Sequence, residues 1–272
     1  MQQSFRDIEH AGWRQKAGAY DDWFAKITSQ AIEPLLRSLG DNLKNARLLD
    51  VCTGTGHLAG AAAKKGALAE GLDFAEEMVA KAKSNYPTVT FRTGDAEQLP
   101  YESNLFDFVV CAFGHLHFAD ADRAITEAAR VLRPGGRYAF TVWCGPDQGS
   151  EFFQILMEAI KAHGSPDVSL PPGPPLFRFA DTVETARTLE SAGFSDVKTT
   201  VVELTWQAER SQDLLELIYK SIVRTPILIE SQPAEARAAI RSAIVRSAER
   251  RRRDGMIRIG FPASLPVACK NW

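Results

Sequence analysis

Five short apolar runs alternate with helical segments over residues 45–145, and this alternation constrains the fold more than any other feature of the chain. Each run has the length and apolar content of a buried strand: ARLLDVCTG, LAEGLDF, VTFRTGDA, FDFVVCAF and RYAFTVW. Strands separated by helices pair in parallel, with the helices packed on both faces of the sheet. The pattern therefore predicts an α/β protein with a doubly wound sheet, in which ligands bind outside the carboxyl ends of the strands.

Helices and further strands flank this core on both sides. Residues 1–44 are predicted to form N-terminal helices, because apolar side chains recur at helical spacing from Trp13 onwards. The segments VKTTVVELTW and IRIGFPASLPVACK supply two more strands, and the two prolines of the last segment imply an edge or bulged strand. We expect one domain over residues 1–272 with a seven-stranded sheet. Its C-terminal part, residues 146–272, would carry cap helices at about 211–253, inserted before the last strand.

Composition and charge exclude several classes of protein. The 272 residues include 32 Lys and Arg against 34 Asp and Glu, a formal charge of −2, and 45% of them are hydrophobic. These values are close to the globular average, which excludes disordered and collagen-like chains. The balanced charge provides no broad positive field, so we expect no nucleic-acid partner. No apolar stretch approaches the roughly 18 residues that cross a bilayer, and we expect a cytoplasmic protein, monomeric or homodimeric.

The four cysteines do not form a recognisable metal or disulfide motif. Cys52, Cys111, Cys144 and Cys269 are scattered through apolar contexts without CxxC or CxxH spacing. This distribution is typical of reduced, buried thiols and argues against a disulfide framework and against a zinc cluster. We therefore expect no metal site.

A glycine-rich turn follows the first strand. Residues 50–57 read DVCTGTGH, and the glycines let the backbone pass close to a ligand before a helix whose N-terminus favours an anionic group. The same glycines fit the G-x-G-x-x-A fingerprint of dinucleotide-binding proteins, so an NAD-dependent oxidoreductase remains open on this motif. Asp73 ends the second strand, 17 residues after Gly56, where a carboxylate is placed to accept hydrogen bonds from two ribose hydroxyls.

A second carboxylate separates the two interpretations. Gly94-Asp95-Ala96 closes the third strand and brings Asp95 to the same sheet edge as Asp73. A carboxylate there accepts from an exocyclic amine while a backbone N–H meets a ring nitrogen, which favours adenine as the bound ring. The oxidoreductase interpretation leaves this segment and the RPGGR turn at 133–137 without a role.

With these motifs in this order, the sequence resembles the class I S-adenosylmethionine (SAM)-dependent methyltransferases, especially the small-molecule branch similar to ubiquinone and menaquinone biosynthesis methyltransferases. The resemblance covers roughly residues 45–145 and rests on LLDVCTGTG, GLDFAEEMVAKAK, FRTGDAEQLPYESNLFDFVV and EAARVLRPGG. It implies a Rossmann-like sheet, SAM as cofactor and S-adenosylhomocysteine (SAH) as product. The cofactor-binding residues that it implies are Tyr20, Asp50, Cys52, Thr53, Gly54, Gly56, Asp73, Phe74, Met78, Asp95, Ala96 and Ala112.

The resemblance also implies a role for several of these residues. The Thr53–Gly56 backbone would meet the methionyl part of SAM, Asp73 the ribose, and Asp95 with Ala96 the adenine. Tyr20 is the candidate aromatic on an N-terminal helix that closes the pocket. The sequence departs from the family at Cys52, which stands where the first loop glycine is expected, so slightly different loop contacts are predicted.

Methyl transfer from SAM requires alignment of a nucleophile and exclusion of water more than any one catalytic group. The segment after the fourth strand, Cys111 to Phe118, forms the rim where an acceptor would lie. His117, and with weaker support His115, are candidate general bases, since an imidazole titrates near working pH. A packed or surface histidine is the alternative for each.

The function that these observations predict is transfer of a methyl group to a small acceptor, hydrophobic or aromatic because aromatic residues are frequent in the C-terminal part. Three alternatives stay open on the sequence. The first is the oxidoreductase, the second a SAM-binding module without catalysis, and the third an RNA methyltransferase that uses the basic stretch Arg250–Arg253. A solvated helix face is the simpler explanation of that stretch.

Overall fold

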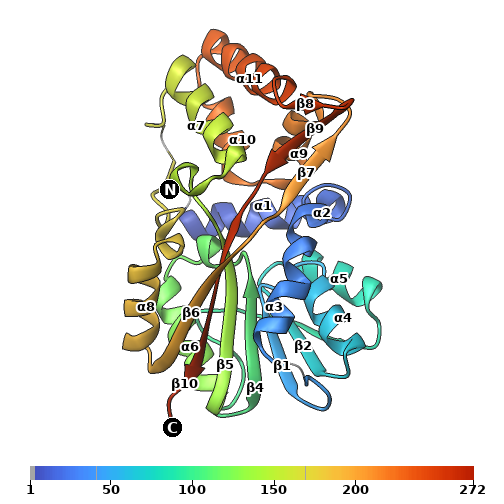
Figure 1. Ribbon diagram of the computed structural model, residues 1–272, viewed down its shortest axis with the longest axis vertical. Coiled ribbons are helices and arrows are strands. Elements are labelled where there is room, and N and C mark those ends of the chain that lie inside the picture. Colours follow the sequence, from blue (N-terminus) through green and yellow to red (C-terminus); the bar gives the residue numbers. More distant parts are fainter. Residues whose placement is uncertain (1–3, 41, 169) are drawn as a thin grey trace.

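The computed structural model describes residues 4–40, 42–168 and 170–272. A large lobe contains the main sheet and its flanking helices, a smaller lobe contains helices and a short sheet, and helix α1 lies across the level where the lobes meet (Figure 1). Within the described ranges, no helix is long and apolar enough to cross a membrane.

The main sheet has the strand order β3-β2-β1-β4-β5-β10-β6. Strands β1 to β5 pair in parallel, whereas β10 pairs antiparallel with both β5 and β6. The predicted seven-stranded, doubly wound sheet is therefore confirmed, with one reversed strand. The strands are β1 (Arg47–Val51), β2 (Leu68–Asp73), β3 (Thr90–Thr93), β4 (Phe106–Ala112), β5 (Leu132–Trp143), β6 (Phe194–Val202) and β10 (Ala263–Lys270).

Apolar side chains on alternate positions of the strands build a core on each face of the sheet. Leu48 packs on the side of α3, α4 and α5, while its neighbour Leu49 packs on the side of α6 and α8. The helices are α3 (Ile32–Ser38), α4 (His57–Lys64), α5 (Glu76–Asn85), α6 (Ala121–Val131) and α8 (Thr182–Ser191). Short turns complete this lobe: α2 (Ala25–Thr28), η1 (Ser29–Ala31), η2 (His115–His117), η3 (Pro146–Gln148) and η4 (Arg178–Ala180).

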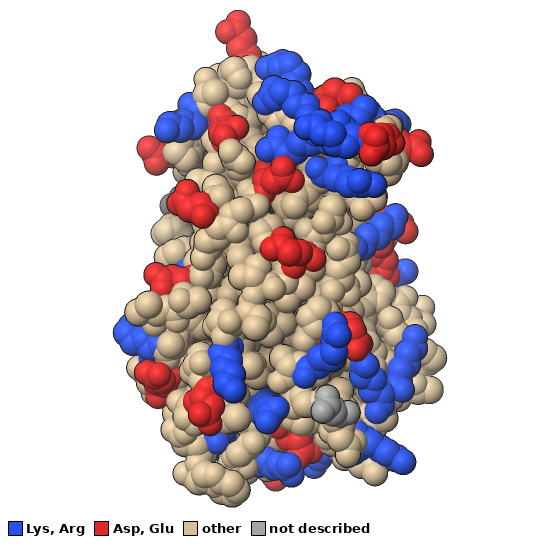
Figure 2. Space-filling view, in the orientation of Figure 1, with Lys and Arg blue, Asp and Glu red and all other residues tan. Residues whose placement is uncertain are grey.

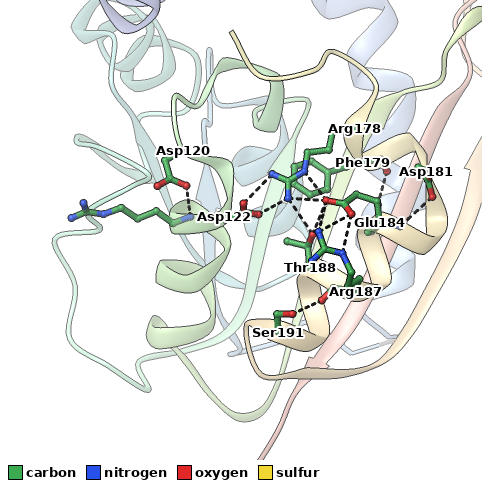
Figure 3. Close-up of polar contacts among 11 residues, drawn as sticks. Asp120, Asp122, Arg178, Phe179, Asp181, Glu184, Arg187, Thr188 and Ser191 are labelled. Atoms are coloured by element: carbon green, nitrogen blue, oxygen red, sulfur yellow. Dashed lines mark hydrogen bonds and ion pairs between the residues drawn. The ribbon is translucent and has the colours of Figure 1, made fainter.

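One arginine joins the two helices on the second face. Arg178 pairs with Asp122 in the first turn of α6 at 2.9 Å and with Glu184 in α8 at 2.9 Å (Figure 3). Its guanidinium also lies over the ring of Phe179, 4.7 Å from the centroid. Its neighbour Arg187, whose side chain is exposed, pairs with Glu184 at 2.8 Å. Arg178 therefore fixes α8 to α6 as well as to the apolar core.

The smaller lobe is assembled from two separate parts of the chain. Its elements are α7 (Glu151–His163), β7 (Thr205–Ala208), α9 (Asp213–Ser221), α10 (Arg224–Glu230), α11 (Ala234–Glu249), β8 (Arg252–Arg253) and β9 (Met256–Gly260). The three strands pair in the order β7-β9-β8, and buried side chains from α7, α9 and α11 pack against them.

The segment predicted as one last strand forms two strands in different sheets. Pro262 separates β9, in the small sheet, from β10, in the main sheet. The prediction of an edge strand was wrong, because β10 lies between β5 and β6. The alternative prediction of a bulged strand agrees with a shift in register between Val267 and Cys269, directly after Pro266.

Helix α1 (Phe5–Tyr20) begins eight residues before the helical spacing that the sequence indicated at Trp13. Ser4 and Asp7 form a capping box that satisfies the first backbone N–H groups and starts the helix at Phe5. Gly12 allows close contact with the smaller lobe, because a Cβ atom there would lie 2.3 Å from Cγ1 of Val223.

Candidate active site

The turn after β1 has the backbone conformation expected for a glycine-rich ligand loop. Gly54 and Gly56 have φ angles of 53° and 86°. Cys52 also adopts a left-handed φ of 57°, which favours glycine and agrees with the glycine that the family resemblance implies there. A Cβ atom on Gly54 would meet no heavy atom within 4 Å, so this part of the loop faces open space.

Asp50 holds the loop from beneath. The Thr53 hydroxyl donates to its Oδ2 at 2.7 Å, and the Ala59 backbone N–H donates to the same oxygen at 3.1 Å. The side chain is buried, and burial raises the pKa of Asp50 to about 8. Asp50 therefore shapes the turn and the start of α4.

Asp73 is the last residue of β2, and its carboxylate also accepts from the loop after β1. The Gly54 N–H donates to its Oδ2 at 2.9 Å, and the Ala75 N–H donates to its Oδ1 at 3.0 Å. The residue is 5% exposed, and burial raises the pKa of this carboxyl to about 6. Each carboxylate oxygen retains a lone pair for a further donor, which fits a pair of ribose hydroxyls.

Three small pockets of about 20, 60 and 50 Å³ follow this edge of the sheet. Every predicted cofactor residue except Gly56 lines at least one of them. Gly56 is packed instead, because a Cβ atom there would lie 2.8 Å from the ring of Phe91. The structure therefore brings the predicted set to one place, with Gly56 serving the turn into α4.

Helix α1 covers these pockets. Arg6 pairs with Asp95, the predicted adenine partner, and Arg14 pairs with Glu77 at 2.8 Å. Tyr20 lies at the other end of the helix, and its hydroxyl is 3.1 Å from the Thr28 hydroxyl. Burial raises the pKa of Tyr20 to about 12, so the phenol stays protonated. Tyr20, the candidate aromatic, thus lines two of the pockets, and the rest of α1 extends the cover over them.

A larger cavity of about 340 Å³ lies between α1, α7, α10 and the Pro/Gly loop near residues 170–176. Its walls are mainly aromatic and aliphatic. Four of its lining residues also line the neighbouring 60 Å³ pocket: Trp13, Phe24, His117 and Trp143. We call these four residues the junction. A wider surface groove on α2 and β7, about 730 Å³, contains none of the predicted site residues.

His117 belongs to a partly buried polar cluster. Its Nδ1 lies 2.8 Å from Oε2 of Glu9, and the Trp13 indole N–H donates to the same oxygen at 3.1 Å. Glu9 is 1% exposed. With Nδ1–H donated to this carboxylate, Nε2 presents a lone pair, and it has no partner among the residues that the structure describes. The arrangement can accept a proton from a group in the cavity.

The other candidate base lies elsewhere. His115 is 1% exposed, its Nε2 is 2.9 Å from the Tyr138 hydroxyl, and its ring centroid is 4.1 Å from that of Phe140. It lines none of the pockets described above. The structure therefore does not bring His115 to the site.

Sequence reasoning did not find Glu9, because the helix was expected to begin near Trp13. Two signals were present in the sequence: the Ser4-x-x-Asp7 cap and the spacing of Phe5, Glu9 and Trp13 at intervals of four. Together they place Glu9 on the same helix face as two aromatic residues.

Comparison with known proteins gives consistent results. Residues 49–140 match the family model described as a methyltransferase domain. Demethylmenaquinone methyltransferase from Chlorobaculum tepidum is 42% identical over 94 residues, 34% of this chain and 39% of that enzyme. The enzyme of the same name from Mycolicibacterium gilvum is 32% identical over 161 residues, 56% of this chain and 69% of that enzyme.

A solved structure extends the similarity of the fold beyond the matched region. The YcgJ protein from Bacillus subtilis superposes with a TM-score of 0.58 at 21% identity, covering 90% of this chain and 99% of that chain. At this identity the likeness concerns the fold. The family model covers residues 49–140, and every element of the smaller lobe lies outside that range.

Proposed function

The chain belongs to the class I SAM-dependent methyltransferases, and from this membership we propose that it transfers a methyl group from SAM to a hydroxyl group of a small hydrophobic or aromatic acceptor. The observation that carries the proposal is the junction. Its four residues line both the 60 Å³ pocket, which contains cofactor residues, and the 340 Å³ cavity, so the two spaces are adjacent. A methyl donor in the pocket would therefore lie next to an acceptor in the cavity.

The residues of the cofactor edge fit SAM. Asp73 has lone pairs for the ribose hydroxyls, the open face of Gly54 accommodates a chain close to the backbone, and Ala96 with Phe74 lines the adenine end. When bound there, SAM supplies a methyl group that its sulfonium already activates. The chain contributes by orienting the acceptor and excluding water, which contributes up to about 7–11 kcal/mol to such reactions.

His117 gives the reaction its general base in this proposal. Its Nε2 takes the proton of the acceptor hydroxyl as the oxygen becomes nucleophilic, and Glu9 holds the ring through Nδ1 in the lining of the cavity. The Trp13 indole N–H donates to the same Glu9 oxygen and helps to fix the carboxylate. The aromatic walls of the junction exclude water from the reacting atoms.

Calorimetry with SAM and SAH, followed by turnover assays on a panel of phenols, tests the proposal. The folded protein should bind both compounds, and the absence of binding of either would remove the proposal. His117→Ala should lower kcat by about 100-fold or more, with SAH affinity unchanged, because it removes the base and leaves the cofactor edge intact. Glu9→Gln should lower kcat by about tenfold. Unchanged turnover in His117→Ala would contradict the assigned base.

The RNA alternative is not favoured by the charged surface. Figure 2 shows Lys and Arg side chains gathered on the smaller lobe, over the part of the molecule where Figure 1 places α11 and β8. Several of these are neutralised: Arg241 pairs with Glu230, and Arg252 pairs with Glu249 at 2.6 Å. RNA binding would make activity depend steeply on salt.

A further inference from the structure

The acceptor cavity contains a cation, Arg224, which lines none of the three cofactor pockets. Arg224 begins α10 and lines the cavity with its side chain half-buried. Its Nη2 donates to the Pro171 carbonyl at 2.8 Å, and its guanidinium lies over the ring of Phe5, 5.0 Å from the centroid. These contacts fix the position of the guanidinium and leave further N–H groups available.

No carboxylate neutralises this guanidinium within the described residues. None of the ion pairs among the described residues includes Arg224. Glu9 is the one acidic residue among those that line the cavity, and its Oε2 is already hydrogen-bonded to His117 and Trp13. The remaining walls are mostly apolar. A half-buried charge in such surroundings is unfavourable unless an anion accompanies it, so the cavity is electrostatically suited to a ligand that carries one.

Helix α1 contacts both this cation and the candidate base, on successive turns of one face. Phe5 lies under Arg224, Glu9 contacts His117, and the two residues are one above the other on the same helix face. Four residues of α-helix rise about 6 Å. An aromatic ring with substituents at its two ends has a comparable length.

From this arrangement we propose that the acceptor is an aromatic or otherwise apolar organic acid, whose hydroxyl faces His117 and whose carboxylate pairs with Arg224. The assignment rests on the proposed methyl transfer and adds the chemical class of its substrate. A guanidinium binds a carboxylate through two parallel N–H donors, which makes Arg224 a specificity-determining residue.

Matched pairs of ligands test this assignment. The probes are para-hydroxyphenyl acids with no, one or two methylene groups between ring and carboxylate, each compared with its primary amide. Binding is measured by calorimetry to the SAH-loaded protein. At least one acid should bind tenfold or more tightly than its amide, since a charge-assisted pair replaces a neutral contact. The series also measures the spacing, because one chain length should fit best.

Variants identify the residue responsible. Arg224→Met should reduce the preference for the acid to less than twofold, and Arg224→Lys should retain part of it. Arg187→Met, which removes an exposed arginine far from the cavity lining, is the matched control and should keep the full preference.

Two results would overturn the inference: no acid that binds more tightly than its amide in the unaltered protein, or a full preference in Arg224→Met. The comparison of acid with amide uses the unaltered protein, so it tests the inference even if a substitution impairs folding. SAH binding in the same titrations separates this test from that of the proposed function. Retained SAH binding and methylation of a neutral phenol, without acid preference, would contradict the substrate class alone.

Discussion

The side chain of Asp73 is expected to make ligand binding depend on pH. Asp73 is buried, and its pKa is raised from 3.8 to about 6, so the carboxylate is ionised at neutral pH and loses its charge within a mildly acidic range. In the proposed site the ionised form is the stronger acceptor for the ribose hydroxyls, because both of its oxygens then accept hydrogen bonds. In the protein without ligand the sign is opposite: the stability contributed by the protonated group is fully present below pH 3.8 and is lost as pH rises through 6.

SAH affinity should therefore be constant above about pH 7 and should fall below pH 6, by up to about tenfold per pH unit. Calorimetry between pH 5 and 8 measures this dependence. Asp73→Asn should weaken SAH binding by about 1.5–3 kcal/mol at pH 7.5 and should flatten the profile. A steep profile that persists in Asp73→Asn would assign the titration to another group.

The sequence predicted the positions of those site residues that directly follow a strand of the parallel sheet. The carboxylates at 73 and 95 and the loop around Gly54 lie together because each follows a strand of a parallel sheet. Glu9 and Arg224 depend on contacts between distant segments, Glu9 with the rim after β4 and Arg224 with α1 and the Pro/Gly loop. Local spacing can place Glu9 on a helix face with Phe5 and Trp13, but it does not specify contacts with distant segments, so the structure was needed to find the roles of these two residues.

At the scale of elements, the position of α1 determines both the cofactor roof and the acceptor cavity. Gly12→Ala would bring a Cβ atom to 2.3 Å from Val223 and force α1 away from the smaller lobe. We expect a loss of about 1–3 kcal/mol in the free energy of unfolding and a lower kcat/KM for the acceptor.

Gly18→Ala is the control on the same helix, because a Cβ atom there meets nothing within 4 Å. It should raise the free energy of unfolding by up to about 1 kcal/mol through helix propensity. Urea denaturation measures both variants. Equal effects at the two positions would show that contact between α1 and Val223 contributes little.

The attachment of α8 to α6 gives a second prediction at this scale. Arg178→Met removes the ion pairs to Asp122 and Glu184 and should lower the free energy of unfolding by about 1–2 kcal/mol (Figure 3). Arg187→Met removes one pair of a side chain that is 65% exposed and should cost less than about 0.5 kcal/mol. Thermal unfolding compares the two, and a larger loss in Arg187→Met would contradict the role given to Arg178.

For the whole molecule, we expect that SAM enters the proposed cofactor site only when α1 moves. The three pockets under it are far smaller than the roughly 300–1,000 Å³ of sites that hold molecules of this size. The Arg6–Asp95 and Arg14–Glu77 pairs hold the helix over them. The amides of α1 should therefore exchange rapidly without ligand and slow by about tenfold or more when SAH is bound. Hydrogen-exchange mass spectrometry measures this, and equal protection with and without SAH would show that α1 is not the moving part.

The arrangement of the core lobe was predictable because strand length, helix spacing and glycine turns alternate regularly over residues 45–145. The smaller lobe was less so. In its sheet, β7 pairs with β9 although three helices separate them in the sequence. The apolar segment that contains Pro262 is divided between β9 in the small sheet and β10 in the main sheet. Both features are set by long-range pairing, which the periodicity of a segment does not specify.

The pairing of β6 with β10 bears on how the segment between these two strands can vary in evolution. The chain leaves the main sheet at Val202 and returns at Ala263, and these two residues are partners in the antiparallel ladder. In topological terms, everything between them is an enlarged hairpin turn. Its length and content can vary while its two ends stay paired at one position of the ladder. New substrate preferences can therefore arise by exchanging parts of that turn, provided that the contact of Val223 with α1, which covers the cofactor edge, is kept.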